Sequence, residues 1–279
     1  MARKKHNSRR GRSRLGKVIQ FLFVVALLVA MTVGATVFFQ VEQVEVSGNA
    51  RYTQEEIVAC TGIKVGDNLF RMNKFAIQDH VKEEMPYIED ILIRRKLPST
   101  ITVTVREWDA VAQILPNPGW TAPEPEETQE GEEIVLPVAS DVSWLISVGG
   151  KLLEQAPAED ARMKITGLTA LDAREGLQMV VPEEEQTRLD AVLSLLEHLE
   201  AREMLSDVSV MEVGSTDLVL EYLGRYDVKL PLNGDFDYKL ESLLAAVADQ
   251  ESKKGQESTG TFDLTQKNYT VVYSPARIK

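Results

Sequence analysis

The longest feature of the hydrophobic pattern is an apolar run near the N-terminus. No ionisable residue occurs between Val18 and Val41, and most of this stretch is hydrocarbon. About 20 helical residues are enough to cross the roughly 30 Å core of a bilayer. Residues 18–40 are therefore predicted to form one transmembrane helix. A cleavable signal peptide is the alternative, since Val33-Gly34-Ala35 suits cleavage, but the run exceeds the usual apolar length of about 7–15 residues.

Residues 41–112 alternate between strand and helix patterns and predict a small α+β module. Val44 and Val46 share one face of a period-two strand, and Thr53-x-x-Glu56 is a capping box that opens a short helix. A second helix follows between Asn73 and Pro86. Two further strands carry their apolar residues at every second position, namely Ile91 and Ile93, then Ile101, Val103 and Val105. The predicted order is β-α-α-β-β.

Residues 113–141 are predicted to be a linker or surface insert. Between positions 116 and 141 the chain has five of its 11 prolines and seven acidic residues, without Lys or Arg. Proline and repulsion between like charges both oppose a packed core. An acidic docking strip is the functional alternative for this segment.

Residues 142–279 have the pattern of a sheet-rich mixed α/β domain. Gly149-Gly150 between two apolar runs predicts a hairpin, and Pro182–Leu205 predicts an amphipathic helix. A second helix is expected after Asn233-Gly234-Asp235, followed by a polar loop at Glu251–Gly260. The residues of that helix predicted to point inward are Leu240, Leu243, Leu244 and Val247. Strands are predicted at 208–213, 218–223, 226–230, 261–264 and 269–274.

The net charge of −12 divides unevenly along the chain. Residues 1–40 hold eight Lys and Arg and no acid, whereas the remainder holds 23 basic and 43 acidic residues, a net charge of −20. Cations beside a span favour cytoplasmic retention, so residues 1–17 are predicted to be a cytoplasmic tail. The protein is thus expected to be a single-pass type II protein of the cell membrane. Such cations attract anionic lipid, and they do not indicate binding of nucleic acid.

The sequence offers no recognisable reaction centre. It contains no His-Glu-x-x-His, Gly-x-Ser-x-Gly or P-loop pattern. The single cysteine, Cys60, is interpreted as a structural thiol, His80 as a residue at the boundary of a helix face, and His198 as solvated. We therefore predict no catalytic residues, cofactor, metal or small-molecule substrate. A glycosidase-like carboxylate pair is the enzymatic alternative, because acidic residues are abundant.

The last apolar segment, at residues 269–274, is the best candidate for a binding surface. It is rich in β-forming residues, carries no charge and places Tyr269 and Tyr273 on one face. A strand at the edge of a sheet exposes backbone N–H and C=O groups that can accept a strand from a partner. A central strand that closes the sheet accounts for the same pattern, and the residues alone leave both readings open.

The order of these segments resembles the bacterial cell-division family FtsQ/DivIB. The residues similar to the family's POTRA module are Val44-Glu45-Val46-Ser47-Gly48-Asn49, Gly62-x-x-x-Gly66-Asp67-Asn68-Leu69-Phe70, Pro86-Tyr87-Ile88 and Arg94–Glu107. Those similar to its β-domain are Ile165–Leu168, Tyr238–Gln250, Thr261–Leu264 and Tyr269–Pro275. Three features depart from the family. In its Glu-x-x-Pro-x-Ala pattern, Ala110 of the segment Glu107–Ala112 stands in place of the proline. Ile146-Ser147-Val148 precedes Gly149-Gly150 without the Asp that members often have there, and the acidic insert is long.

The resemblance implies a non-enzymatic divisome scaffold at the division septum. It would bind division proteins of the FtsB/DivIC and FtsL types by strand addition, with help from the helix near Tyr238–Gln250. The strand carried over from the family consists of Asn268, Tyr269, Thr270, Val271, Val272, Tyr273 and Ser274. A POTRA-bearing factor for protein assembly or transport in the envelope is the alternative, and further POTRA repeats would be expected in it.

Overall fold

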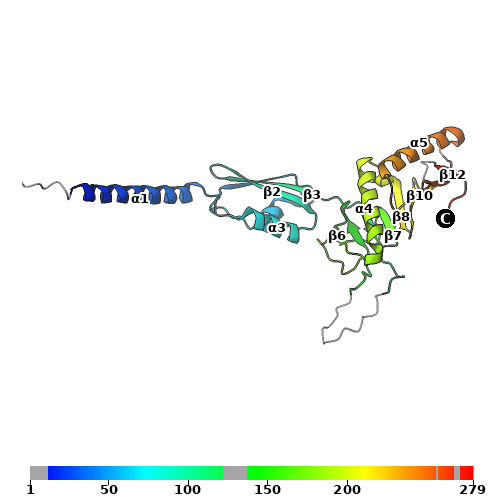
Figure 1. Ribbon diagram of the computed structural model, residues 1–279, viewed down its shortest axis with the longest axis horizontal. Coiled ribbons are helices and arrows are strands. Elements are labelled where there is room, and N and C mark those ends of the chain that lie inside the picture. The colour runs from blue at the N-terminus through cyan, green and yellow to red at the C-terminus, as the bar shows by residue number, and fades with distance from the viewer. Residues whose placement is uncertain (1–11, 122–136, 256, 267–270, 279) are drawn as a thin grey trace, which may run out of the picture. The chain divides into compact units, whose positions relative to one another are not determined.

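The computed structural model describes residues 12–121, 137–255, 257–266 and 271–278 (Figure 1). They form two compact units. The first contains the chain up to Val81 together with Asp90–Glu107, and the second contains Lys82–Glu89 and the chain from Trp108 onward. Both units combine helices with a sheet, as the predicted α+β class requires.

A long helix, α1 (Arg12–Phe38), begins the described chain. Its stretch Gly16–Gly34 has a mean hydropathy of 2.2 and is long and apolar enough to cross a membrane. The described side chains of this stretch are not buried by other parts of the protein. A helix that is apolar on all sides and has no protein cover needs another apolar environment, which indicates anchoring in a membrane.

The first unit has the predicted order β-α-α-β-β. Its elements are β1 (Gln43–Ser47), α2 (Gln54–Thr61), α3 (Lys74–Glu84), β2 (Ile88–Lys96) and β3 (Thr100–Glu107). They form a three-stranded sheet of order β1-β3-β2, in which β1 runs parallel to β3. The alternating Ile and Val residues of β2 and β3 are buried, so the predicted inward faces are confirmed.

The helix boundaries of the first unit follow local chemistry. Thr53 Oγ1 accepts from the Glu56 backbone N–H at 3.2 Å, and Glu56 Oε2 accepts from the Thr53 N–H at 2.8 Å. These bonds with Thr53 hold the pKa of Glu56 below its ordinary value. Gly62 ends α2 in a left-handed conformation, and Asn73 Oδ1 accepts from the Ala76 N–H at 3.4 Å at the start of α3. The predicted caps are therefore confirmed.

The second unit is built on a nine-stranded sheet of order β12-β11-β10-β9-β8-β7-β4-β5-β6. Its strands are β4 (Ala112–Ile114), β5 (Trp144–Ile146), β6 (Leu152–Gln155), β7 (Met163–Thr166), β8 (Val208–Val213), β9 (Asp217–Tyr222), β10 (Tyr226–Pro231), β11 (Gly260–Asp263) and β12 (Val272–Ser274). The predicted hairpin is the antiparallel pair β5–β6. The pairs β4–β7, β7–β8 and β10–β11 are parallel.

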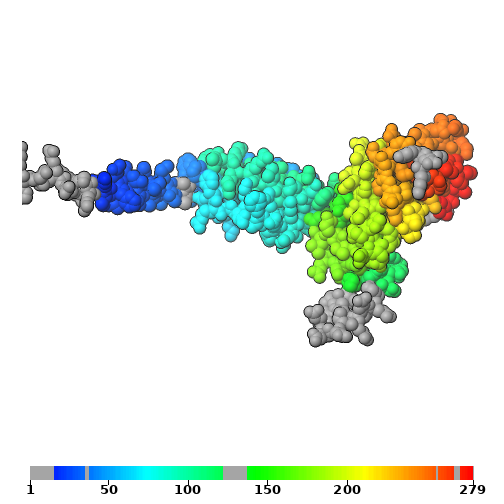
Figure 2. All heavy atoms as spheres, viewed as in Figure 1, coloured from blue at the N-terminus to red at the C-terminus, as the bar shows by residue number. Residues whose placement is uncertain are grey.

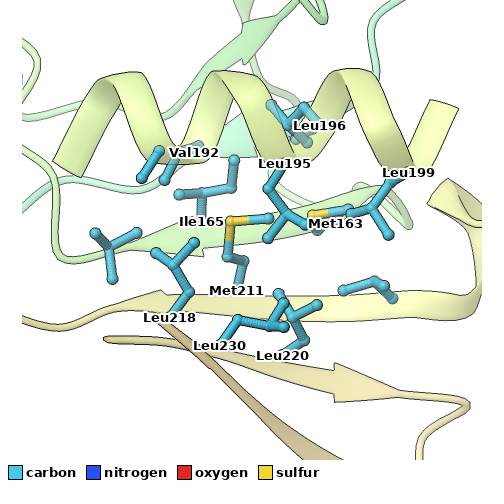
Figure 3. Packing of buried hydrophobic residues seen from close by; sticks show 14 of the residues in the cluster. Met163, Ile165, Val192, Leu195, Leu196, Leu199, Met211, Leu218, Leu220 and Leu230 are labelled. Carbon is cyan, nitrogen blue, oxygen red and sulfur yellow. The ribbon is translucent and has the colours of Figure 1, made fainter. Parts of the chain in front are cut away.

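Two long helices complete the second unit. A short 3-10 helix, η1 (Glu183–Glu185), leads into α4 (Gln186–Ala201); η2 (Leu205–Asp207) precedes β8, and α5 (Phe236–Lys254) follows β10. Leu195 and Leu199 of α4 are fully buried and point toward Met163 and Met211 of the sheet (Figure 3). Each such leucine contributes about 1.5–3 kcal/mol when it leaves water. The described core of the unit therefore lies between α4, α5 and the sheet.

Several predicted positions differ in the structure. Leu244 is 38% exposed, because the inward stripe of α5 is narrower than the apolar pattern. His198 is half-buried, not solvated: its Nδ1 lies 2.7 Å from Ser194 O and its ring 6.1 Å from that of Phe236. The neighbouring helix α5 supplies that cover, and a single helix pattern does not reveal it.

Two predicted loop boundaries also differ. Gln113 and Ile114, which the sequence placed in the linker, are buried in β4 between β5 and β7. The helix α5 continues to Lys254, so it includes the first part of the predicted polar loop. Short strands and polar helix ends show little hydrophobic periodicity in the sequence. Contacts with neighbouring elements decide whether such residues form a strand, a helix or a loop.

Candidate partner-binding site

The strand β12 lies at one edge of the nine-stranded sheet. It pairs antiparallel with β11, with Tyr273 opposite Phe262, and no other described strand pairs with it. Asn268, Tyr269 and Thr270 of the predicted binding segment lie outside the described residues. Among the described residues, β12 is an edge strand as predicted, and the alternative of a central strand that closes the sheet is wrong.

The hydrogen bonds of β11 reveal which of its backbone groups face β12. Gly260 N donates to Arg225 O at 3.4 Å, and Leu264 N donates to Lys229 O at 2.9 Å, both toward the β10 side. Backbone direction alternates along a strand, so the even-numbered residues of β11 face β10. The odd-numbered residues of β11 consequently face β12.

The same alternation shows which groups of β12 face outward. Val272 and Ser274 stand opposite the odd-numbered residues of β11, and their backbone groups bond within the sheet. The N–H and C=O of Tyr273 therefore point to the open side, and so does the C=O of Val271, which shares a planar peptide with the inward N–H of Val272. Pro275 follows and has no N–H, so it ends the row of donors. A partner strand would meet Val271 and Tyr273.

The side chain of Tyr273 holds β12 in place. Its ring lies 5.2 Å from the Phe262 ring, Lys254 Nζ lies 5.1 Å from its centroid, and its hydroxyl donates to Thr259 O at 2.7 Å. Val271 also packs against the core of the unit, whereas Val272 is 46% exposed. The strand is thus fixed from one face while its outer backbone groups are not used by described strands.

Gly260 allows β12 to lie close to β11. A Cβ atom at this position would stand 2.3 Å from Ser274 O and 2.8 Å from the ring of Tyr273. No side chain fits in this space, since real Cβ contacts are longer. The sequence reasoning treated Gly260 only as the end of a loop; its place directly before a strand was the available signal.

Residues after β12 are tied to the sheet by Arg277. Its guanidinium donates to Asp227 Oδ1 at 2.6 Å and to Glu221 Oε1 at 2.9 Å, and Ile278 N donates to Asp227 Oδ2 at 2.6 Å. Hydrogen bonds to Asp227 and then to Glu221 raise the pKa of Arg277. The cation therefore stays charged and secures the segment that follows the edge strand. The sequence reasoning missed this contact, which joins residues 50 positions apart.

The helix α5 adjoins β12 on the surface (Figure 2, orange and red). Lys254, at the end of the helix, contacts Tyr273 of the strand. On its outer side α5 presents Tyr238, 41% exposed, and Leu244, 38% exposed. Exposed aromatic and aliphatic side chains beside an edge strand are suited to contact a partner that pairs with the strand.

Comparison with known proteins gives the chain, and its first unit above all, a family context. The family model for the FtsQ-type POTRA domain matches residues 39–108. The chain is 33% identical over 101 residues to cell division protein DivIB of Clostridium botulinum strain Hall, covering 36% of this chain and 39% of the relative. Cell division protein FtsQ of Corynebacterium glutamicum is 32% identical over 95 residues, covering 33% of this chain and 42% of the relative.

A longer match extends into the second unit. Cell division protein FtsQ of Geotalea daltonii is 26% identical over 215 residues, which cover 76% of this chain and 68% of the relative. These matches support the assignment of the chain to the FtsQ/DivIB family. The first relatives are matched over only about two fifths of their own length, so the family's POTRA module is the best-supported part of the likeness.

Within the described part of the chain, the remaining candidate residues, Cys60 and His80, do not gather into a second site. Cys60 is partly buried near the end of α2, and His80 is exposed on α3. Among the residues described here, no group of three or more His, Cys, Asp and Glu side chains could hold a metal ion. The β12 edge is therefore the candidate site among the described residues.

Proposed function

We propose that this FtsQ/DivIB family member is a membrane-anchored, non-enzymatic scaffold of the cell-division machinery that receives a partner's β-strand along β12. The observation that carries the proposal is the outward direction of the backbone groups of Tyr273, and an added strand would extend this row to Val271. In strand addition, main-chain hydrogen bonds supply affinity and alternate side chains supply selectivity. Val272, half-exposed on the strand, would contact such side chains.

The relatives support a role in division. All three quoted above are named as cell division proteins, and none carries the name of an enzyme or a transport factor. The apolar helix α1 supports anchoring in a membrane. Together these findings favour a scaffold of the division apparatus over the transport factor and the envelope enzyme.

The proposed partners are division proteins of the FtsB/DivIC and FtsL types, as the family resemblance implies. Tyr238 and Leu244 on α5 would contact the chain that leads into or out of the added strand. The eight cations within residues 1–40 favour a cytoplasmic N-terminus, and this orientation of α1 supports an extracytoplasmic β12. The expected location is the division septum.

Replacing Val271 by proline tests the strand-addition site. The change removes one outward N–H donor and leaves the backbone pairs between β11 and β12 in place. We expect the full-length Val271→Pro protein, extracted from membranes, to lose capture of the FtsB/DivIC-type partner in a pull-down. Val271→Ala is the matched control, because it shortens the same side chain and keeps the N–H donor.

The two variants also separate binding from folding. Proline restricts the preceding residue, so thermal unfolding of both proteins is measured alongside the pull-down. Capture that is equal for Val271→Pro and the unmodified chain would contradict the site. Loss of capture by Val271→Ala as well would contradict backbone pairing and favour a side-chain contact.

A further inference from the structure

The chain passes from α1 into the first unit through a short bonded segment. Leu69 N donates to Phe39 O at 3.0 Å, directly after the last residue of α1. Gly66 N donates to Val41 O at 2.8 Å, and the backbone of Gln40 forms a β-bridge with Asn68. The loop between α2 and α3 is therefore bound to the residues that emerge from the helix.

This bonding fixes the loop at a short distance from the apolar stretch. Gly34 ends that stretch, and Phe39 follows five residues later. Five helical residues rise about 7–8 Å. The headgroup region on each side of a bilayer is about 5–8 Å thick, from a total of about 40–45 Å and a core of about 30 Å. A loop bonded to Phe39 lies at the level of the headgroups when α1 spans the membrane.

The same end of the first unit exposes large apolar side chains. Val65 is 76% exposed and Phe70 is 55% exposed, and both belong to the loop between α2 and α3. Leu97, in the turn between β2 and β3, is 57% exposed. This turn lies beside the start of β1, because Glu42 N donates to Ser99 O at 2.8 Å. The three apolar side chains thus belong to the two segments that are bonded to the chain where it leaves α1.

Cations dominate the two segments that carry these apolar residues. Segments 63–75 and 94–99 contain a single carboxylate, Asp67, and six cations, namely Lys64, Arg71, Lys74, Arg94, Arg95 and Lys96. The whole chain, by contrast, has a net charge of −12. A cavity of about 500 Å³ beside Gln40 and Arg71 opens in the same loop. Exposed apolar side chains among cations are typical of segments that lie in a membrane interface.

We propose that the first unit docks on the bilayer surface beside α1, with Val65, Phe70 and Leu97 in the interface and Lys64 and Arg71 on anionic lipid phosphates. The proposal rests on the proposed membrane anchoring. Anchoring holds the loop permanently next to the lipid, so even weak contacts are occupied at the resulting high local concentration. Docking then limits the orientations that the first unit adopts relative to the membrane.

Depth-dependent quenching in vesicles tests the docking. Full-length protein with Cys60→Ser receives one cysteine, Val65→Cys or Leu97→Cys, and a fluorophore on that thiol. The protein is reconstituted into phosphatidylglycerol–phosphatidylethanolamine vesicles whose headgroups carry a spin label. We expect strong quenching at both positions. Ser47→Cys is the control, because Ser47 is exposed at the far end of β1 in the same unit, and its label should stay bright.

Two comparisons decide the outcome. Quenching should fall when Lys64→Glu and Arg71→Glu are combined, or when phosphatidylcholine replaces the anionic lipid. Equal quenching under these conditions would overturn the role of the cations. Labels at 65 and 97 that stay as bright as the label at 47, in protein that floats with the vesicles, would overturn the docking and leave the anchoring intact. Protein that fails to float would contradict the anchoring and, with it, the docking.

Discussion

The two edges of the nine-stranded sheet are treated differently. At the β6 edge, Leu152 N donates to Leu177 O and Gly176 N donates to Leu152 O, both at 2.8 Å. Met179 N also donates to Gly150 O at 2.9 Å. The loop segment from Gly176 to Met179 therefore closes this edge. At the β12 edge, no described strand or loop pairs with the outward groups of Val271 and Tyr273.

A covered edge prevents unwanted strand pairing, whereas an open edge allows a partner to bind. An unpaired edge invites unwanted pairing, and proteins commonly cover it with a loop, as β6 is covered here. The second unit therefore covers one edge of its sheet with a loop, and a loop could cover the other edge in the same way. The described β12 edge lacks it, which is the arrangement expected of a strand reserved for a partner.

The largest expected effect comes from the core residues beneath the two edges. Phe262 and Leu152 are each 1% exposed. Phe262→Ala should cost about 3–5 kcal/mol and Leu152→Ala about 2–5 kcal/mol in denaturant unfolding of the second unit. Phe262→Ala should also speed hydrogen exchange in β12, because Tyr273 packs on that ring. Unchanged exchange at β12 in Phe262→Ala would show that the open edge does not depend on this contact.

A smaller effect should follow from opening the closed edge. Gly176 has φ +84°, a left-handed conformation, and a Cβ there would meet nothing nearer than 3.6 Å. Gly176→Ala should therefore act through backbone strain, at about 1–2 kcal/mol. The strain loosens the loop that covers β6, so hydrogen exchange at Leu152 should rise.

Gly255→Ala is a matched control for that change. Gly255 also has φ +84° and open space around its Cα, but it lies at the end of α5, away from β6 in sequence. It should also lower the free energy of unfolding through backbone strain, since its ψ of 171° suits glycine alone, without raising exchange at Leu152. Equal exchange at Leu152 in the two variants would mean that the loop does not protect this edge.

The smallest expected effect is a difference in pH response between the edges. Burial raises the pKa of Asp263 in β11, but hydrogen bonds from the Thr265 hydroxyl and N–H outweigh it, and the pKa falls below its ordinary value. A lowered carboxyl pKa contributes stability that is present above the unfolded pKa and lost as pH falls through the folded pKa. The β11 end near β12 should therefore loosen in acid.

The closed edge should respond in the opposite range. Burial lowers the pKa of Lys151, just before β6, so the folded state disfavours its charged form. Stability near β6 should then rise as pH increases through the interval between the folded and unfolded pKa values of this lysine. NMR titration of both edges checks the pair of responses. In Thr265→Val the acid response of Asp263 should shift to higher pH, and an unshifted titration would contradict its assignment to this hydrogen bond.

Much of the fold could be predicted because its signals are local. The capping box at Thr53 and Glu56, the alternation through β2 and β3, and the apolar stretch of α1 depend on residues within a few positions of one another. The FtsQ/DivIB likeness was visible for the same reason, since its POTRA residues are continuous in the chain. Leu244 and His198 were misplaced because the cover on a helix face comes from another element.

The sequence by itself determined the elements, the apolar span and the last strand-forming segment of the chain. The tertiary structure alone decided that β12 is an edge strand, because that position depends on β12 pairing with β11 and with no other described strand. It also brought Gly260 and Lys254 to the strand that they support, and Asp227 to Arg277 in the segment after the strand. The physical reason is that hydrogen-bond partners across a sheet are separated by long stretches of chain, and no local periodicity records which strands become neighbours.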